Sequence, residues 1–192
     1  MQANAYWFEL RQALVQNRDA AGADFFVNAG RVRQSGLELL AIYQTQPTRA
    51  TWWQHLQGQV GYSWQPYSYR QYVKLGQNLA GKQLPGIARH QLQMQALALL
   101  GKQWHISAAA FYNSALWFND ANTAKAPAFW LLNARLQWKP AKSKATLPAL
   151  FAGVENLLDA RYTQAPDINA AGGRYWNVAP GRLGYLGVRW GG

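Results

Sequence analysis

The chain has 192 residues, enough for one domain with a sizeable core, but only 14% of them are charged, against about 25% in typical soluble domains. Ten Trp and ten Tyr accompany eight acidic residues, and so many aromatic side chains favour an amphipathic environment such as a membrane interface. The formal net charge of +11 would suit nucleic acid, but Lys and Arg are spread over segment ends instead of forming one patch, so we expect no nucleic-acid partner. Cysteine is absent, which excludes disulfides and thiolate chemistry.

Apolar and polar residues alternate with a period of two through most of the chain, which predicts β-strands. The first expected strand, residues 5–15, sets an apolar side against Glu9 and Arg11; that side consists of Tyr6, Phe8, Leu10 and Leu14. Further strands are expected at 24–45, 52–64, 88–100, 103–117, 128–138, 147–157 and 182–190. The sequence therefore predicts an all-β fold of about eight strands.

Residues 128–138 alternate most clearly. One side of this strand carries Trp130, Leu132, Ala134, Leu136 and Trp138, and the other carries Leu131, Asn133, Arg135 and Gln137. The polar sides of the neighbouring strands are likewise rich in Gln, Asn, Ser and His, whereas a soluble sandwich usually presents Lys, Glu and Thr to water. Aromatic residues at both ends of an apolar side are typical of a membrane barrel with a wet lumen. We expect Trp130, Leu132, Leu136 and Trp138 to face lipid.

The connections between the expected strands alternate in length. Residues 46–49, 101–102 and 140–144 are short, whereas residues 65–87, 117–127 and 159–181 are long and rich in Gly, Asn, Pro and Tyr. Short turns at one rim and long loops at the other are the layout of an outer-membrane barrel, with the short turns on the periplasmic side.

Three motifs occur in an order that resembles one family. Residues 28–39 resemble the pattern N-x-G-x-x-R-x-x-G-x-E through Gly36 and Glu38, and residues 81–90 resemble G-x-x-L-P-G-x-P-x-H, with Ala88 where proline is usual. A third segment reads Asn-Leu-Leu-Asp-Ala-Arg-Tyr and precedes a Pro-x-Arg and an aromatic strand; its marker residues are Asn156, Leu157, Asp159, Tyr162, Arg182 and Trp190. Together they resemble the C-terminal part of TonB-dependent outer-membrane receptors.

This resemblance implies a barrel of roughly 22 strands whose lumen holds an N-terminal plug domain. Residues 1–192 would be the C-terminal barrel segment, an open, curved antiparallel sheet without the plug domain or a signal peptide. The family imports ferric siderophores, cobalamin, haem or sugars across the outer membrane of Gram-negative bacteria. Its implied partners are outer-membrane lipid, the TonB complex acting through the plug, the barrel-assembly machinery acting through the C-terminal strand, and an iron chelate as cargo. Gly191 and Gly192 after Trp190 depart from the usual terminal aromatic residue.

The residues predict neither an enzyme nor a cofactor or metal. His55, His90 and His105 fall on separate strands without metal-ligand spacing. Residues 119–122 place oxygen ligands at alternate positions but lack the Gly turn and distant Glu of a calcium loop, so we interpret them as an ordinary loop.

Ligand contacts are expected in the long loops, where two clusters combine aromatic rings with positive charge. The clusters are Tyr67, Tyr69, Arg70, Tyr72 and Lys74, and Arg174, Tyr175 and Trp176. Such residues suit an anionic, aromatic iron chelate, although a simple aromatic girdle would also contain them. Two further functions stay open: a complete small outer-membrane barrel with a structural or adhesive role, and a soluble carbohydrate-binding β-protein.

Overall fold

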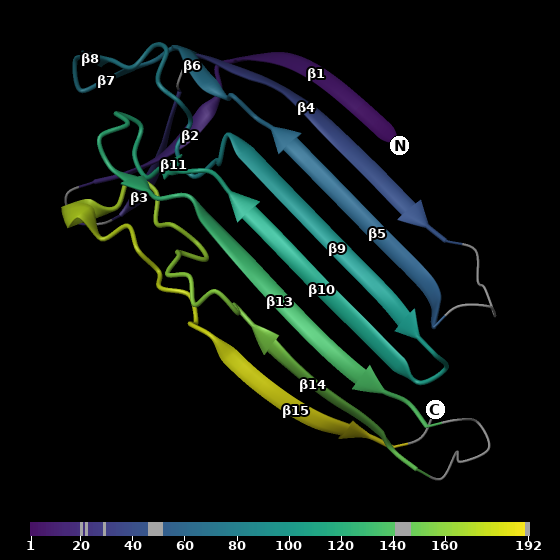
Figure 1. Ribbon diagram of the computed structural model, residues 1–192. Coiled ribbons are helices and arrows are strands. Elements are labelled where there is room, and N and C mark those ends of the chain that lie inside the picture. The colour runs from purple at the N-terminus through teal and green to yellow at the C-terminus, as the bar shows by residue number, and fades with distance from the viewer. Residues whose placement is uncertain (20, 22, 29, 46–51, 141–146, 191–192) are drawn as a thin grey trace.

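A computed structural model describes residues 1–19, 21, 23–28, 30–45, 52–140 and 147–190. Eight long strands follow one another across one antiparallel sheet in the order β1-β4-β5-β9-β10-β13-β14-β15, which confirms the expected all-β class (Figure 1). Their bounds are β1 Gln2–Arg11, β4 Arg31–Gln44, β5 Trp53–Trp64, β9 His90–Leu100, β10 Trp104–Asn113, β13 Phe129–Trp138, β14 Ala149–Glu155 and β15 Leu183–Arg189. The part of the chain that the structure describes contains no helix long and apolar enough to cross a membrane.

The sheet is open. Among the described strands, β1 pairs with β4, β15 pairs with β14, and the two outer strands do not pair with each other. Figure 1 shows them at opposite edges of the sheet. This confirms the expected open sheet and contradicts a closed eight-stranded barrel, which would need a hydrogen-bonded seam between β1 and β15.

The register of the central strands keeps like residues on one side. One row across β5, β9, β10 and β13 is Gln59, Gln95, Ala109 and Asn133; the next row is Val60, Met94, Ala110 and Leu132. We call the first side the polar face and the second the apolar face. Because successive side chains of a strand point to opposite sides, Leu132 and Leu136 lie on the apolar face, and Asn133 and Arg135 on the polar face, as expected.

The apolar face ends in aromatic residues at both rims. On β13, Trp130 and Trp138 lie eight residues apart, about 26 Å along the strand, close to the ~25 Å apolar band of membrane barrels. Trp104 lies opposite Trp138, and Tyr112 packs on Trp130 with ring centroids 4.9 Å apart. Leu136, on β13 between Trp130 and Trp138, is 43% exposed, so no other described part of the chain covers this face here.

The first expected strand faces the other way. β1 stops at Arg11, and Leu14 belongs to a separate hairpin, β2 (Leu14–Arg18) with β3 (Asp24–Asn28). Glu38 lies opposite Asn4 on one side and Ser63 on the other, which puts the even-numbered residues of β1 on the polar face. The prediction that Tyr6, Phe8 and Leu10 form the apolar side was therefore wrong.

Glycine explains this reversal. Tyr6 lies directly opposite Gly36, and a Cβ at Gly36 would be 2.6 Å from Tyr6 Cζ, so the Tyr6 ring occupies the space over the glycine. Two other aromatic–glycine pairs on the polar face follow the same pattern: Tyr185 with Gly153, and Phe151 with Gly187. An aromatic residue on a strand can thus face the lumen when its cross-strand neighbour has no side chain.

Two further expected strands are shorter than predicted. Gly30, with φ of +68°, separates β3 from β4 within the predicted strand 24–45. The predicted strand 103–117 ends at Asn113, and β11 (Leu116–Trp117) pairs with β12 (Lys125–Ala126) in the following loop. Of the expected short connections, the structure describes 101–102; residues 46–49 and 141–144 lie outside the described residues, as do Gly191 and Gly192.

Candidate functional site: the loop layer

Three long connections pack on one another at the same end of the sheet (Figure 1). They are residues 65–89, which include β6 (Ser68–Gln71), β7 (Val73–Lys74) and β8 (Gln77–Asn78); residues 114–128; and residues 156–182, which include the short η2 helix (Ala171–Gly173). Backbone hydrogen bonds join Gly86 N to Trp117 O (2.8 Å) and Asn169 N to Phe118 O (2.9 Å). Asn122 also exchanges two hydrogen bonds with the backbone of Gln83. We call these three connections the loop layer.

Asp120 lies at the centre of the loop layer and is 2% exposed. Its carboxylate accepts a hydrogen bond from the Tyr69 hydroxyl (2.7 Å) and forms an ion pair with Lys74 (2.9 Å), and its backbone N–H donates to the Asn169 side chain (3.1 Å). A buried carboxylate is costly unless it is paired and hydrogen-bonded. Groups from all three connections therefore meet at Asp120, the first connection at its carboxylate and the third at its backbone N–H, and this arrangement holds the loops together.

The first predicted ligand cluster is divided by burial. Tyr69 and Tyr72 are 1% and 3% exposed and pack with Val32 and Leu79, with the two tyrosine rings 4.8 Å apart. Burial, and secondly the charge of Asp120, raise the pKa of the Tyr69 phenol, so this hydroxyl stays a donor at neutral pH. With Lys74 held by Asp120, the exposed member of the cluster is Arg70.

Tyr67, the remaining member, is half-buried, and its hydroxyl lies 2.6 Å from that of Tyr6. Because Tyr6 belongs to the polar face, Tyr67 sits where the loop layer meets that face. It therefore links the loops to the wall of the sheet.

The second predicted cluster surrounds Phe118. Tyr175 stacks on the Phe118 ring (centroids 5.1 Å apart, planes 7° apart), and Trp176 meets the same ring edge-on at 5.3 Å. Phe118 is 1% exposed, whereas Arg174 is exposed and Trp176 is 45% exposed. The structure thus brings Arg174 and Trp176 to the surface above a buried aromatic support.

Sequence reasoning missed Phe118 and Asp120 as organising residues. The segment 119–122 did show an Asp between two Asn residues, a composition that signals hydrogen-bonded turns as well as calcium ligands. Within the described residues no group of three or more His, Asp or Glu side chains could hold a metal ion.

The family-motif residues shape the base of connection 156–182. Asn156, with φ of +48° and 5% exposure, exchanges hydrogen bonds with the backbone of Ala160 (2.8 and 2.9 Å). The Asp159 side chain accepts a hydrogen bond from Arg182 N (2.9 Å), and Leu157 N donates to Leu132 O (2.7 Å). These bonds place the start of the connection beside its end and fasten it to β13. Tyr162 stacks on Phe129, and Trp190 is 77% exposed after β15.

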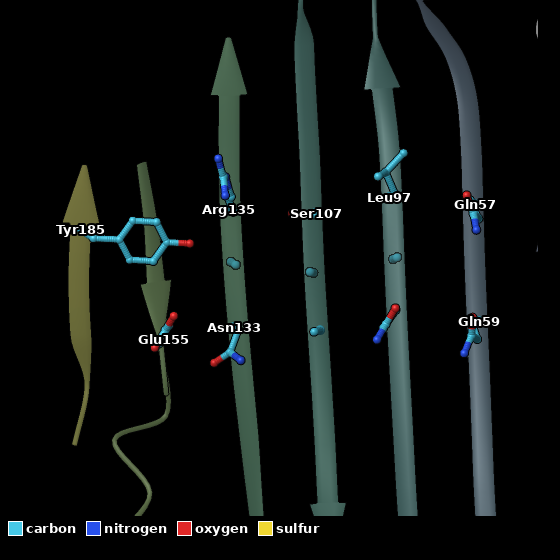
Figure 2. A pocket seen from close by; sticks show the side chains of 13 residues that line it. Gln57, Gln59, Leu97, Ser107, Asn133, Arg135, Glu155 and Tyr185 are labelled. Atoms are coloured by element: carbon cyan, nitrogen blue, oxygen red, sulfur yellow. The ribbon is translucent and has the colours of Figure 1, made fainter. Parts of the chain in front are cut away.

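A shallow hollow of about 320 Å³ lies over the polar face in the middle of the sheet. Figure 2 shows its lining side chains on neighbouring strands: Gln57, Gln59, Leu97, Ser107, Asn133, Arg135, Glu155 and Tyr185. Arg135 also lies over the Phe151 ring, 4.3 Å from its centroid. Neutral amides both donate and accept hydrogen bonds, so this wall suits polar contacts of many kinds.

An open antiparallel sheet with one polar face, one uncovered apolar face between aromatic rims, and long loops at one end defines a piece of a membrane β-barrel. The family model described as "TonB dependent receptor-like, beta-barrel" matches residues 1–157. The chain belongs to this family, as its motifs predicted.

Solved structures of receptors and transporters share the fold of this chain. The siderophore receptor PiuA from Acinetobacter baumannii superposes with a TM-score of 0.71 at 19% identity, over 98% of this chain and 25% of that one. The ferric-catecholate import receptor Fiu from E. coli K12 gives 0.67 at 16% identity (96% and 24% covered), and the ferric citrate transporter FecA gives 0.66 at 18% identity (96% and 28% covered). The chain spans about a quarter of the length of these proteins.

Proposed function

We propose that the chain is the C-terminal barrel segment of a Gram-negative outer-membrane receptor that takes up a ferric siderophore or a similar scarce nutrient. The observation that carries the proposal is the loop layer, which presents Arg70, Arg174 and Trp176 to solvent at one rim. Exposed cations and an indole ring attract an anionic chelate with aromatic groups. The similar structures named above, two of them receptors for siderophores or ferric catecholates, support this choice of cargo.

The predicted site residues divide into two groups by their exposure. Arg70, Arg174 and Trp176 contact the cargo, because their side chains are exposed. The other residues position them. Tyr69, Tyr72 and Lys74 hold the first loop through the buried cluster and Asp120, and Tyr175 holds Trp176 through Phe118.

In the complete receptor, the polar face would line the path of the cargo and face the plug domain. Energy would reach the receptor from the TonB complex through that plug, and the last strand would be read by the barrel-assembly machinery. Gln, Asn and Ser side chains over the central strands fit this role, because neutral amides and hydroxyls form hydrogen bonds with water and with many kinds of polar cargo.

The test is cargo binding by the full-length receptor that carries this segment. We expect the R70Q/R174Q double variant to lose at least about a hundredfold in affinity for an anionic ferric chelate, since hydrogen bonds to charged groups contribute about 1.5–3 kcal/mol each and the variant removes two charged side chains. The matched control is K102Q, which removes a cation from the short turn 101–103 at the opposite rim. Unchanged affinity for every ferric chelate tried, together with binding of a neutral sugar or cobalamin, would refute the proposal.

A further inference from the structure

A second hollow, of about 300 Å³, lies beside the loop-side ends of β9 and β10. Three basic residues, Arg89, His90 and Lys125, line it together with Ser114, Trp117 and Gln83, and no acidic side chain does. Among the residues that the structure describes, neither Arg89 nor Lys125 forms an ion pair, whereas Lys74 and Arg31 do. Within the described part of the chain, no acidic side chain therefore neutralises the positive charge of this hollow.

The hollow adjoins the aromatic rim of the apolar face. His90 lies opposite Trp64 in the register, and its ring stacks on Tyr62, whose hydroxyl is 2.8 Å from His90 Nδ1. Tyr62 and Trp64 belong to the apolar face through their partners Leu39 and Leu37. Lys125 lies over the Trp117 ring, 5.6 Å from its centroid. The hollow thus begins at His90 on the apolar face, beside the aromatic residues of that rim, and Arg89 and Lys125 line it from the adjoining connections.

The strands around this hollow are all present in the chain. β9 has β5 as its outer neighbour and β10 has β13, so no strand from elsewhere in the barrel can insert between them. Another basic hollow, near Arg11 and Arg31, differs in its strand neighbours and in its charge. It lies beside β1, which is an edge strand, and Glu9 lies 3.5 Å from Arg31. Of these two hollows, the one at Arg89 and Lys125 lies beside strands whose neighbours on both sides are described in this chain.

Aromatic side chains settle at the level of lipid headgroups, and cations just outside them attract anionic headgroups. Arginine and lysine together bind phosphate through charge-assisted hydrogen bonds. We infer that the hollow lined by Arg89, His90 and Lys125 binds the phosphate of an anionic lipid headgroup in the leaflet at the long-loop rim. This inference rests on the proposed membrane-spanning function, but it does not depend on which cargo is carried.

The test is native mass spectrometry of the full-length receptor titrated with phosphatidylglycerol, with phosphatidylcholine as the lipid of zero net charge. We expect R89Q/K125Q to weaken phosphatidylglycerol binding about tenfold or more, since each cation near a membrane contributes on the order of 1 kcal/mol. The matched control is K102Q/R189Q, which removes the same two charges at the opposite rim and should bind like wild type. Glutamine removes the charge but keeps a polar, hydrogen-bonding side chain. Circular dichroism checks that both variants are folded.

Three outcomes would overturn the inference: an equal loss in both double variants, which indicates diffuse charge; no preference for phosphatidylglycerol over phosphatidylcholine; or displacement by inorganic phosphate at the lipid concentration, which indicates a soluble anion site. Ferric-chelate affinity measured on the same proteins separates this inference from the proposed cargo. R89Q/K125Q should leave it unchanged, whereas R70Q/R174Q should lower it and leave lipid binding intact.

Discussion

The sheet and the loop layer distribute burial in opposite ways. The largest fully buried side chains are Tyr69, Phe118, Leu79, Val32 and Asp120, and all of them lie in the loop layer or pack against it. The long strands of the sheet instead leave large apolar side chains such as Leu136 and Trp104 more than one-third exposed. The loop layer is therefore built like a small water-soluble protein, whereas the sheet depends on lipid at one face and an aqueous lumen at the other.

The largest effect should come from a charge on the apolar face of the sheet. Leu132→Arg should destabilise the full-length receptor in lipid vesicles by about 2–4 kcal/mol, because the guanidinium would enter hydrocarbon. The free energy of unfolding in urea measures this. Gln95→Arg, on the polar face two strands away, is the matched control and should cost little. Similar costs at both positions would show that the two faces do not meet different solvents.

Removing the central carboxylate should open the loop layer while leaving the sheet intact. Asp120→Ala deprives the Tyr69 hydroxyl and the Lys74 ammonium of their acceptor, which should cost about 2–3 kcal/mol locally. Hydrogen exchange should speed up in residues 65–89 and 114–128, which the carboxylate joins, and stay unchanged in β9 and β10. Asp19→Ala, in the β2–β3 hairpin, removes an acid elsewhere and should not affect the loop layer. Faster exchange throughout the sheet would contradict two separately stabilised regions.

A smaller effect is expected where the two regions join. Gly36→Ala would place a methyl group 2.6 Å from the Tyr6 ring and 2.6 Å from Trp64 O, and should cost about 1–3 kcal/mol through overpacking. Gly61→Ala, where no atom lies within 4 Å of the new methyl group, should be close to neutral in the same urea unfolding measurement. If Gly36→Ala costs less in the Tyr6→Ala background than in the wild type, the Tyr6 ring causes the destabilisation. Equal costs for Gly36→Ala and Gly61→Ala would contradict this explanation.

The sheet was more predictable than the loop layer for a physical reason. Strands such as 128–138 have a period of two that is visible in a few residues, so their number and the faces of Leu132 and Asn133 followed from local sequence. The first strand misled because its aromatic residues, Tyr6 and Phe8, can lie on either face.

The loop layer has no such period. Its central contact joins Tyr69 to Asp120, 51 residues apart, and nothing near either residue indicates the partner. The sequence did identify aromatic and basic residues in these loops, but exposure separates Arg70 from Tyr69, its neighbour in the chain. That difference depends on tertiary packing, so a sequence pattern could not assign the two residues different tasks.

The three aromatic–glycine pairs have a consequence for how the strands find their alignment. They occur in β1–β4 and β14–β15, the two outermost pairs, where each edge strand has one partner in the chain to fix its position. A slip of two residues keeps polar and apolar sides correct, so hydrophobicity alone does not forbid it. It would, however, move the Tyr6 ring from Gly36 onto Gln34 or Glu38, where a side chain already occupies that space. Each pair thus destabilises a two-residue slip in register, which the alternation of polar and apolar residues would allow.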